Sequence, residues 1–377
     1  MRVLILSCNT GEGHNSCAKA IQESFRNEGI DCGIQDALTF ISPGVSRFMS
    51  SWHTRIYRYV PQLFRIGYRL AEHHQEMFRE DSLLSRQLFA RGTQRLWEFL
   101  CNGGYDIVVC THVFAALMLT DVRRRHSDWN AWCAFVNTDY TCSPSTGDSK
   151  LDRYFTPEES LNGEFTALGI PKERLVASGI PILQAFLSKL PKTQAKAALG
   201  IPEDCPHLLI MCGSMGCGPI RKLTGRIAAA LKQEERLSVV CGTNRRLYQQ
   251  LRRRYREDDR VLVLGYADNV PLLMDSADLF LTKPGGLSVT EAEAKGLPMV
   301  LINAVAGCED YNKRYLVQKG CAVEETTVDA LTSRCLELLR DSAALERMSA
   351  CCGTNRGAEQ IVQTLRKDAQ EYENGRL

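Results

Sequence analysis

The chain has 377 residues, a length that fits two domains of ordinary size. Its composition is average, with 44% hydrophobic residues, 24% charged residues and a net charge of +2, which argues against a protein that binds nucleic acid through its overall charge. The sixteen cysteines form no C-x-x-C pair and no Cys/His cluster with zinc-site spacing, which indicates reduced thiols in a cytoplasmic protein.

The first apolar run, Val3–Leu6, is too short for the core of a signal peptide. No apolar run approaches the ~18 residues of a membrane span. We therefore expect a cytoplasmic chain that meets a membrane, if at all, from its surface.

The first predicted strand, Arg2–Cys8, leads into the glycine-rich turn Asn9–Asn15 and an amphipathic helix that starts at Ser16. The turn matches neither G-x-G-x-x-G nor Walker A, which argues against NAD or ATP binding. His14 lies at the mouth of the helix, whose positive end is expected to lower the pKa of the imidazole and keep it neutral. A neutral histidine there suits a general base. A loop histidine that only hydrogen-bonds the backbone fits the same pattern.

The segment Gly44–Leu100 interrupts the alternation of strands and helices. Within Gly44–Leu70, five arginines interleave with six aromatic residues, and no acidic residue is present. Such a segment suits an anionic membrane interface or single-stranded nucleic acid. It also fits a helical pair that covers the sheet, with its arginines in water. Pro61 breaks or begins a helix within it.

Polar residues directly follow two further predicted strands. His112 comes after the strand Tyr105–Cys110, and Asp139 comes after the strand Trp132–Val136. The carboxyl ends of strands face the ligand crevice in open α/β sheets. We therefore expect His112 either to line the site or to serve the fold, and Asp139 to orient a histidine or bind a substrate hydroxyl.

The domain boundary is predicted near Leu183–Lys192. The second half opens with the strand His207–Cys212 and another glycine-rich turn, Gly213–Gly218. Further predicted strands alternate with helices and indicate a second doubly wound sheet: Leu237–Cys241, Val261–Leu264, Asp278–Leu281 and Met299–Ile302. The pattern from Asp329 on is helical, with a break at Cys351–Gly353.

The strand that ends at Leu281 feeds Lys283–Gly286 and then a helix. Glycines at a helix start let backbone N–H groups approach a diphosphate, and the helix N-terminus adds partial positive charge. Glu291 follows about one turn later, where a carboxylate can accept hydrogen bonds from ribose hydroxyls. An ordinary strand-to-helix turn has the same glycines, so this motif alone leaves both readings open.

Eight short motifs occur in order along nearly the whole chain. They are N-T-G-E-G-H-N-S (9–16), T-H (111–112), T-D-Y (138–140), G-I-P (179–181), G-S-M-G (213–216), G-Y-A-D-N-V (265–270), K-P-G-G-L-S-x-x-E-A (283–292) and G-C-E-x-x-N (307–312). With these motifs the chain resembles the group that includes monogalactosyldiacylglycerol synthase and processive diacylglycerol glucosyltransferase. It is more distantly similar to the peptidoglycan N-acetylglucosaminyl transferase.

The resemblance implies an α/β GT-B fold with two Rossmann-like, doubly wound domains facing a central cleft. An acceptor- and membrane-facing domain would span residues 1–185, with 44–100 as a helical insertion. A UDP-sugar domain would span 186–350, followed by a C-terminal helix over 351–377. The implied activity is inverting transfer of a hexose from a UDP-sugar to a lipid, in the first place diacylglycerol, by an enzyme peripheral on the cytoplasmic face of the membrane. Transfer to a soluble acceptor is the alternative.

By the same resemblance, twelve residues of the C-terminal domain hold the UDP-sugar: Gly213, Ser214, Tyr266, Val270, Lys283, Gly285, Gly286, Leu287, Ser288, Glu291, Glu309 and Asn312. The glycine turns would face the diphosphate, with Tyr266 and Val270 beside the uracil. Glu291 would hold the ribose, and Glu309 and Asn312 would hold the sugar hydroxyls.

His14 would be the base that takes the proton of the acceptor hydroxyl, with Asp139 as its rival or assistant. Six residues would form the acceptor and lipid side: Gly11, Gly13, Trp52, Tyr57, Pro61 and His112. The implied partners are a UDP-sugar, a lipid acceptor and an anionic membrane surface, without nucleic acid. The UDP-sugar is a substrate, so no cofactor is implied. The chain contains no D-x-D motif of the metal-dependent transferases, and we expect no metal.

Two positions depart from the family pattern. Cys308 stands where the family commonly has glutamine, in the loop that contacts the sugar, which leaves the identity of the donor sugar open. The run Tyr140–Pro144 lacks the histidine that some members carry after T-D, so no role of that histidine transfers to this chain.

Overall fold

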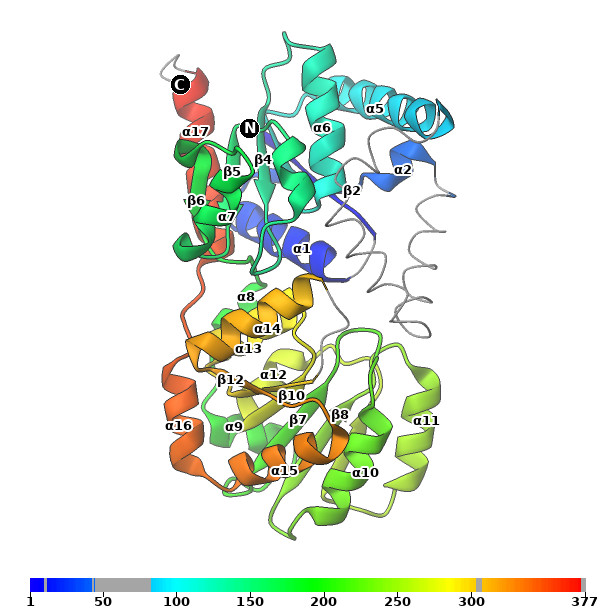
Figure 1. Ribbon diagram of the computed structural model, residues 1–377, viewed down its shortest axis with the longest axis vertical. Helices are drawn as coiled ribbons and strands as arrows, with labels where there is room; N and C mark the ends of the chain where they lie inside the picture. Colours follow the sequence, from blue (N-terminus) through cyan, green and yellow to red (C-terminus); the bar gives the residue numbers. More distant parts are fainter. Residues whose placement is uncertain (10–11, 43, 45–82, 303–306, 374–377) are drawn as a thin grey trace. The chain divides into compact units, whose positions relative to one another are not determined.

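The computed structural model describes residues 1–9, 12–42, 44, 83–302 and 307–373 (Figure 1). These residues form two compact units, which we describe one at a time. The first unit holds the described residues up to Gln184 together with those from Asn355 onward. The second unit runs from Ala185 to Thr354.

The described part of the first unit contains one sheet of six parallel strands in the order β2-β1-β3-β4-β5-β6. Its strands are β1 Arg2–Ser7, β2 Asp31–Asp36, β3 Ile107–Cys110, β4 Trp132–Val136, β5 Arg153–Thr156 and β6 Leu175–Ala177. Alternate side chains of β1 enter opposite cores: Val3 and Ile5 pack on one face of the sheet, and Leu4 and Leu6 pack on the other. The sheet is therefore buried on both faces, as parallel sheets are.

Helices cover both faces of this sheet (Figure 1). One face packs against α1 Glu12–Asn27 and α17 Gly357–Glu373, and the other packs against α5 Leu83–Gly103 and α6 Val113–Arg125. Shorter helical segments connect these elements: α2 Leu38–Ile41, η1 Pro144–Asp148, η2 Glu159–Leu161, α7 Asn162–Ala167 and η3 Lys172–Arg174.

The second unit repeats the architecture with a parallel sheet in the order β12-β11-β10-β7-β8-β9. Its strands are β7 His207–Met211, β8 Arg236–Val240, β9 Val261–Leu264, β10 Leu279–Thr282, β11 Met299–Leu301 and β12 Ala322–Glu324. The helices of this part of the chain are α8 Gln184–Leu187, α9 Lys192–Ala198, α10 Ile220–Ala230, α11 Arg245–Arg254, α12 Val270–Ser276, α13 Gly286–Lys295, α14 Cys308–Lys319, α15 Val328–Leu339 and α16 Ser342–Ala350. Leu208 and Ile210 of β7 pack against α10, α11 and α15 in one core.

The two doubly wound parallel sheets predicted from the sequence are confirmed, and the helical break at Cys351–Gly353 is confirmed as well. The predicted helix start at Ser16 is wrong, because α1 begins at Glu12. An acidic residue in the first turn suits the positive end of a helix, and a side chain at Gly13 would meet nothing within 4 Å. The strand β12 was not predicted, since three residues are too few to show a period.

The chain returns to the first unit after α16. Asn355 Nδ2 donates to the Ile180 carbonyl at 2.8 Å, and a Cβ on Gly357 would lie 2.8 Å from the Gly179 carbonyl oxygen. The backbone of the G-I-P motif is therefore in close contact with the segment Asn355–Gly357. Beyond this contact, α17 packs along α1 as part of the first unit.

A buried ion pair fastens α17 to the sheet. The guanidinium of Arg153 on β5 donates to both carboxylate oxygens of Asp368 on α17, at 2.7 and 2.8 Å. The two side chains are only 16% and 6% exposed. Removal of one partner from such a pair leaves a buried charge uncompensated.

We therefore predict that Asp368→Ala lowers the free energy of unfolding by about 3 kcal/mol. Urea denaturation of the full chain measures this change. Glu371→Ala is the matched control on the same helix, because Glu371 faces the exposed Lys367 at 3.9 Å and such pairs contribute within about 1 kcal/mol. Equal losses in the two variants would contradict the assigned role of Asp368.

Candidate active site

In each sheet, successive strands are added first on one side of the first strand and then on its other side. β1 lies between β2 and β3 in the first unit, and β7 lies between β8 and β10 in the second. The loops after such neighbouring strands diverge and leave a crevice at their carboxyl ends, which is where open α/β sheets bind ligands. The predicted residues His14 and His112 follow β1 and β3, and Gly213 and Lys283 follow β7 and β10.

His14 lies in the first turn of α1, and its ring is oriented by two other loops. Nδ1 lies 2.9 Å from the carbonyl oxygen of Thr111 and 3.0 Å from Oγ1 of Thr138. A carbonyl oxygen can only accept, so Nδ1 carries the proton. Nε2 is then the unprotonated nitrogen, which is the atom that a general base requires.

The pKa of His14 is lowered from its usual value of 6.5, as the sequence predicted. The main cause, however, is one that the sequence did not predict. Burial of the imidazole is the main cause, while the nearby Asp139 carboxylate and the Thr111 carbonyl act in the opposite direction. His14 is therefore neutral at physiological pH, and Asp139 is close enough to stabilise its protonated form.

His112 is the N-cap of α6. Its Nδ1 accepts a hydrogen bond from the backbone N–H of Phe114 at 3.0 Å, so Nε2 carries the proton. The His112 ring meets the His14 ring edge to face, with 4.7 Å between the centroids. The two histidines thus hold opposite tautomers side by side: Nε2 of His14 can accept a proton, and Nε2 of His112 can donate a hydrogen bond. His112 therefore serves the fold as a helix cap beside His14, and its contact with a ligand stays a prediction.

Two further predicted residues of the first unit lie at the same edge. Asp139 is half-buried after β4, in a loop that Asn137 holds through hydrogen bonds to the Asp139 and Thr141 carbonyls. Gly13 follows Glu12 in the first turn of α1. The other predicted acceptor residues lie outside the described residues: Gly11, Trp52, Tyr57 and Pro61.

In the second unit, Lys283 connects three loops at the carboxyl edge of the sheet. Its side chain passes over Gly213, where a Cβ would come within 2.7 Å of Lys283 Cε. Gly213 also has a φ of +69°, a conformation that disfavours any side chain. Lys283 Nζ then reaches Glu309 Oε1 at 2.6 Å, beside Gly285. Four of the predicted donor residues are therefore brought together around one ion pair.

The turn that contains Ser214 packs closely against a second turn, residues 241–244. The sequence analysis did not identify this second turn. A Cβ on Gly216 would overlap the Cys241 carbonyl oxygen, and a Cβ on Gly242 would overlap that of Ser214. The Thr243 N–H donates to Ser214 O at 2.8 Å, and Asn244 Nδ2 donates to Gly216 O at 3.1 Å. The sequence signal was available, since residues 241–244 form a further glycine turn after a strand.

The helix α13 starts directly from the Lys283–Gly286 turn. Gly285 is its N-cap and Gly286 its first residue, and Leu287 and Ser288 continue the first turn with both side chains partly exposed. This first turn leaves backbone N–H groups available to an anion. Further along, Glu291 is 7% exposed, and burial raises its pKa from 4.5 to about 8. Glu291 is thus protonated at neutral pH, and its predicted contact with ribose stays a prediction.

The remaining predicted donor residues differ in exposure. Tyr266 follows β9 and is 61% exposed, which suits an aromatic surface for a base. Val270 is the first residue of α12. Asn312 is fully buried on α14, where its Nδ2 donates to the Pro284 carbonyl at 3.0 Å. Asn312 therefore holds the Lys283–Gly286 turn, and its contact with a sugar stays a prediction.

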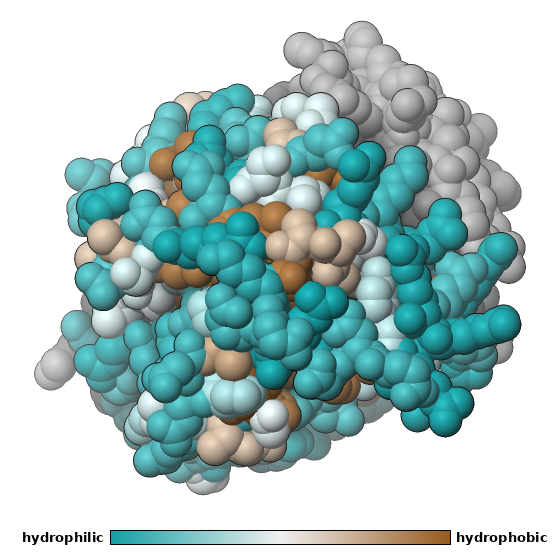
Figure 2. Space-filling model, turned by 90° about the horizontal axis from the view of Figure 1, so that it is seen from below, coloured by the Kyte–Doolittle hydropathy of each residue, from teal (hydrophilic) through white to brown (hydrophobic). Residues whose placement is uncertain are grey.

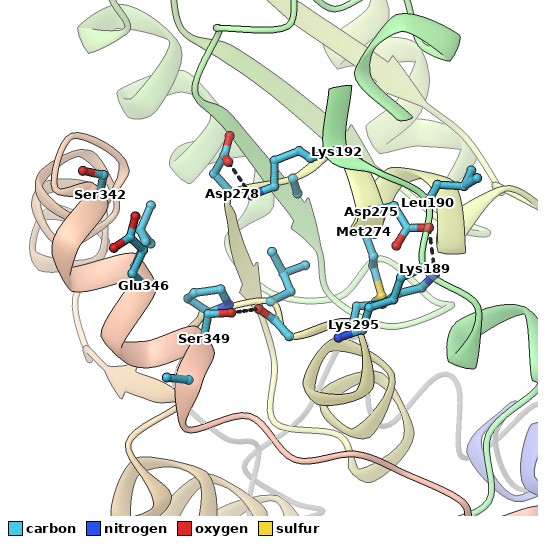
Figure 3. Close-up of a pocket in the computed structure, with 16 residues that line it drawn as sticks. Lys189, Leu190, Lys192, Met274, Asp275, Asp278, Lys295, Ser342, Glu346 and Ser349 are labelled. Atoms are coloured by element: carbon cyan, nitrogen blue, oxygen red, sulfur yellow. Dashed lines mark hydrogen bonds and ion pairs between the residues drawn. The ribbon is translucent and has the colours of Figure 1, made fainter. Parts of the chain in front are cut away.

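A separate cavity of about 570 Å³ lies at the opposite edge of the same sheet (Figure 3). Asp278 and Pro298, which precede β10 and β11, are among its lining residues, and none of the predicted donor residues is. Two of its lysines are already paired, Lys192 with Asp278 at 2.6 Å and Lys295 with Asp275 at 2.8 Å. We therefore do not assign the donor to this cavity.

Two family models match different parts of the chain. Residues 14–182 match the family described as monogalactosyldiacylglycerol (MGDG) synthase, and residues 207–365 match the glycosyltransferase family 28 C-terminal domain. The chain is thus a UDP-sugar glycosyltransferase whose first half is similar to monogalactosyldiacylglycerol synthases. A processive diacylglycerol beta-glucosyltransferase of Staphylococcus saprophyticus is 24% identical over 362 residues, which cover 94% of this chain and 89% of that protein.

Two solved structures share the fold. MurG of Acinetobacter baumannii superposes with a TM-score of 0.64 at 15% identity, over 97% of this chain and 99% of that one. A UDP-GlcNAc 2-epimerase from Neisseria meningitidis bound to UDP-GlcNAc gives a TM-score of 0.63 at 14% identity, over 97% and 100% of the two chains. A transferase and an epimerase thus fit equally well, so the GT-B fold is established by these structures and the reaction is not.

The raised pKa of Glu291 makes a prediction about stability. Between its usual pKa of 4.5 and its folded value of about 8, the folded chain binds one proton more than the unfolded chain. This contribution to stability is therefore present below pH 4.5 and is lost as the pH rises to about 8. Relative to Glu291→Gln, the wild type should lose on the order of 3 kcal/mol between about pH 5 and about pH 8.

Urea denaturation across this pH range measures the difference. Glu346→Gln, at an exposed position on α16, controls for the loss of one carboxylate. Parallel profiles for the wild type and Glu291→Gln would mean that Glu291 is ionised in the folded chain and would sink the prediction.

Proposed function

We propose that this protein transfers a hexose from a UDP-sugar to diacylglycerol, with inversion at the anomeric carbon. The observation that carries the proposal is His14, a neutral histidine with Nδ1 held by Thr111 and Nε2 left unprotonated, in the unit that matches monogalactosyldiacylglycerol synthase. The relatives named as diacylglycerol beta-glucosyltransferases support the acceptor.

On the donor side, the UDP diphosphate would lie against the Gly213 turn and the first turn of α13. Backbone N–H groups and the helix N-terminus would then face the charge that develops on the leaving UDP. Tyr266 would stack on the uracil, beside the backbone of Val270. Glu309 would hold the sugar from its place at the start of α14, where Lys283 fixes it.

On the acceptor side, the hydroxyl oxygen of diacylglycerol attacks the anomeric carbon as the bond to the UDP oxygen breaks. Nε2 of His14 takes the hydroxyl proton, and the electron pair of the broken bond leaves with UDP. The Asp139 carboxylate would stabilise the imidazolium that forms, or would itself be the base. His112 could donate its Nε2–H to an acceptor oxygen and align it.

A lipid acceptor requires the protein to work at a membrane surface. None of the helices in the described part of the chain is long and apolar enough to cross a bilayer. We therefore propose peripheral attachment on the cytoplasmic face. A soluble acceptor is the alternative, and it would leave transfer unaffected by vesicles.

Binding of UDP is the first test. UDP at a hundred times its dissociation constant should stabilise the folded chain by about 2.7 kcal/mol and raise the melting temperature. Glu291→Ala should remove this shift, and Glu346→Ala should keep it. The absence of a shift with millimolar UDP in the wild type would exclude the proposed donor.

The base is tested through His14. His14→Gln should lower transfer to diacylglycerol at least ~100-fold while the UDP shift is kept, because the imidazole acts on the acceptor and not on UDP. The acid limb of kcat/KM should lie below pH 6.5, since the pKa of His14 is lowered from that value. His126→Gln is the matched control, because His126 stacks on Trp97 at the other end of α6.

The same assay separates the two candidates for the base. Asp139→Asn should reduce transfer less than His14→Gln if Asp139 only assists. A larger loss in Asp139→Asn, with substantial turnover left in His14→Gln, would assign the base to Asp139.

A further inference from the structure

The outer face of α11 carries only arginine and glutamine. The helix sequence is RRLYQQLRRR, and its five arginines are exposed while Leu247 and Leu251 are buried in the core. The arginines are Arg245, Arg246, Arg252, Arg253 and Arg254. Hydrophilic residues cover most of the coloured surface at the lower right of Figure 2, on the side where α10 and α11 lie in Figure 1.

The neighbouring helix α10 extends this basic surface. Arg221, Lys222 and Arg226 are exposed on it, and Arg254 Nη1 lies 3.7 Å from the position of a Cβ on Gly225, so the end of α11 meets α10. Residues 220–256 contain eleven basic and two acidic residues, in a chain whose net charge is only +2. We call the exposed face of these two helices the α10–α11 surface.

Ion pairs account for little of this charge. Within the described ranges, Arg226 pairs with Asp329 at 3.4 Å, and both side chains are well exposed, at 66% and 75%. Such an exposed pair contributes little. The five arginines of α11 form no ion pair with any residue that the structure describes.

Helix stability explains only part of the arginine run. Arg252, Arg253 and Arg254 lie in the last turn, where cations interact favourably with the helix dipole. Arg252 also bonds to the Tyr248 hydroxyl at 3.0 Å. Arg245 and Arg246 lie in the first turn, where a cation is unfavourable.

Arg246 and Arg253 are seven residues apart and therefore share one side of the helix. Neither forms an ion pair or a side-chain hydrogen bond with another described residue. Their positions thus point to something outside the chain.

We propose that the α10–α11 surface docks on an anionic lipid bilayer. This inference rests on the proposed lipid acceptor, which a transferase must reach at a membrane. Clustered arginines are attracted to the negative potential of anionic lipids. The apolar side of α11 is already buried, so the contact is electrostatic and requires no insertion. Single-stranded nucleic acid fits less well, because Tyr248 and Tyr255 are partly buried against the core and do not form a stacking platform.

The docking helix is also fastened to the donor site. Asn244 caps α11 by accepting from the Leu247 N–H at 3.1 Å, and its Nδ2 holds the Gly216 carbonyl. Gly216 belongs to the turn after β7 that is proposed to face the diphosphate. A bilayer bound along α11, which is roughly 15 Å long, would therefore orient the donor unit without any moving part between.

The test uses the full chain with vesicles of phosphatidylcholine that contain about a third phosphatidylglycerol, and compares Arg246→Gln/Arg253→Gln with the wild type. Each arginine near an anionic surface strengthens binding roughly fivefold, so the partition coefficient of this double variant should fall roughly 30-fold. Arg246→Lys/Arg253→Lys should retain binding, because it keeps both charges. Salt should weaken wild-type binding, and vesicles of phosphatidylcholine alone should bind little.

A matched control separates a local surface from net charge. Lys189→Gln/Arg347→Gln removes the same two charges from exposed positions in the same unit, away from α10 and α11, and should bind as the wild type does to within about twofold. Equal losses in the two charge-removing variants, or no loss in Arg246→Gln/Arg253→Gln, would overturn the proposal. So would binding to a short DNA duplex that the variant loses, without binding to vesicles.

Transfer to diacylglycerol in neutral detergent micelles separates this proposal from the proposed function. Micelles present the acceptor without a charged bilayer, so Arg246→Gln/Arg253→Gln should keep full activity there and lose it on anionic vesicles. Vesicle binding that depends on α11, together with no transfer in micelles by the wild type, would support docking and reject the transferase. If the wild type transfers in micelles and the double variant binds vesicles as the wild type does, the transferase is supported and docking through α11 is rejected.

Discussion

The ion pair between Lys283 and Glu309 depends on the absence of a side chain at Gly213. Lys283 leaves β10, crosses Gly213 and meets Glu309 at 2.6 Å, with only 18% and 8% of the two side chains exposed. A Cβ on Gly213 would occupy the path of the lysine at 2.7 Å. Three loops from different parts of the second unit are thereby fixed in one arrangement. A buried pair of this kind is costly to break, because the remaining charge loses its partner. The Lys283–Glu309 ion pair therefore fixes the geometry of the proposed donor site without a ligand.

Several glycines allow another stretch of backbone to approach closely. In the second unit, the Cys241 carbonyl lies close against Gly216, and the Ser214 carbonyl lies close against Gly242. In the first unit, the Gly179 carbonyl lies close against Gly357. These glycines serve packing, whatever else they bind. Gly213 and Gly285, by contrast, stand beside Lys283 at the crevice between the loops of β7 and β10. The glycines after strands thus include two kinds of position, and only contacts in the fold distinguish them.

Two of the titratable groups proposed to meet substrate, His14 and Glu291, are held neutral by burial. The pKa of His14 is lowered and that of Glu291 is raised, so neither carries a charge at neutral pH. In the proposed reaction, negative charge therefore develops on the leaving UDP, and positive charge develops on His14 when it takes the proton. Asp139 lies near enough to stabilise that second charge. Basic charge is concentrated instead on α10 and α11, outside the crevice, where it is available to a surface.

The sequence by itself determined the two doubly wound sheets, because apolar runs punctuated by glycine turns are local signals, and the ordered motifs revealed the resemblance to diacylglycerol glycosyltransferases. It also located His14, Asp139 and Lys283 at strand ends. Only the tertiary structure decided the tautomer of His14, which depends on Thr111 and Thr138, 97 and 124 residues away. The tertiary structure also decided the position of α17, which is paired with β5 across 215 residues. It decided as well that the arginines of α11 are exposed, because Leu247 and Leu251 on the other side of the helix are buried. Secondary structure follows from neighbours a few residues apart, whereas protonation, ion pairing and exposure follow from which distant segments pack together.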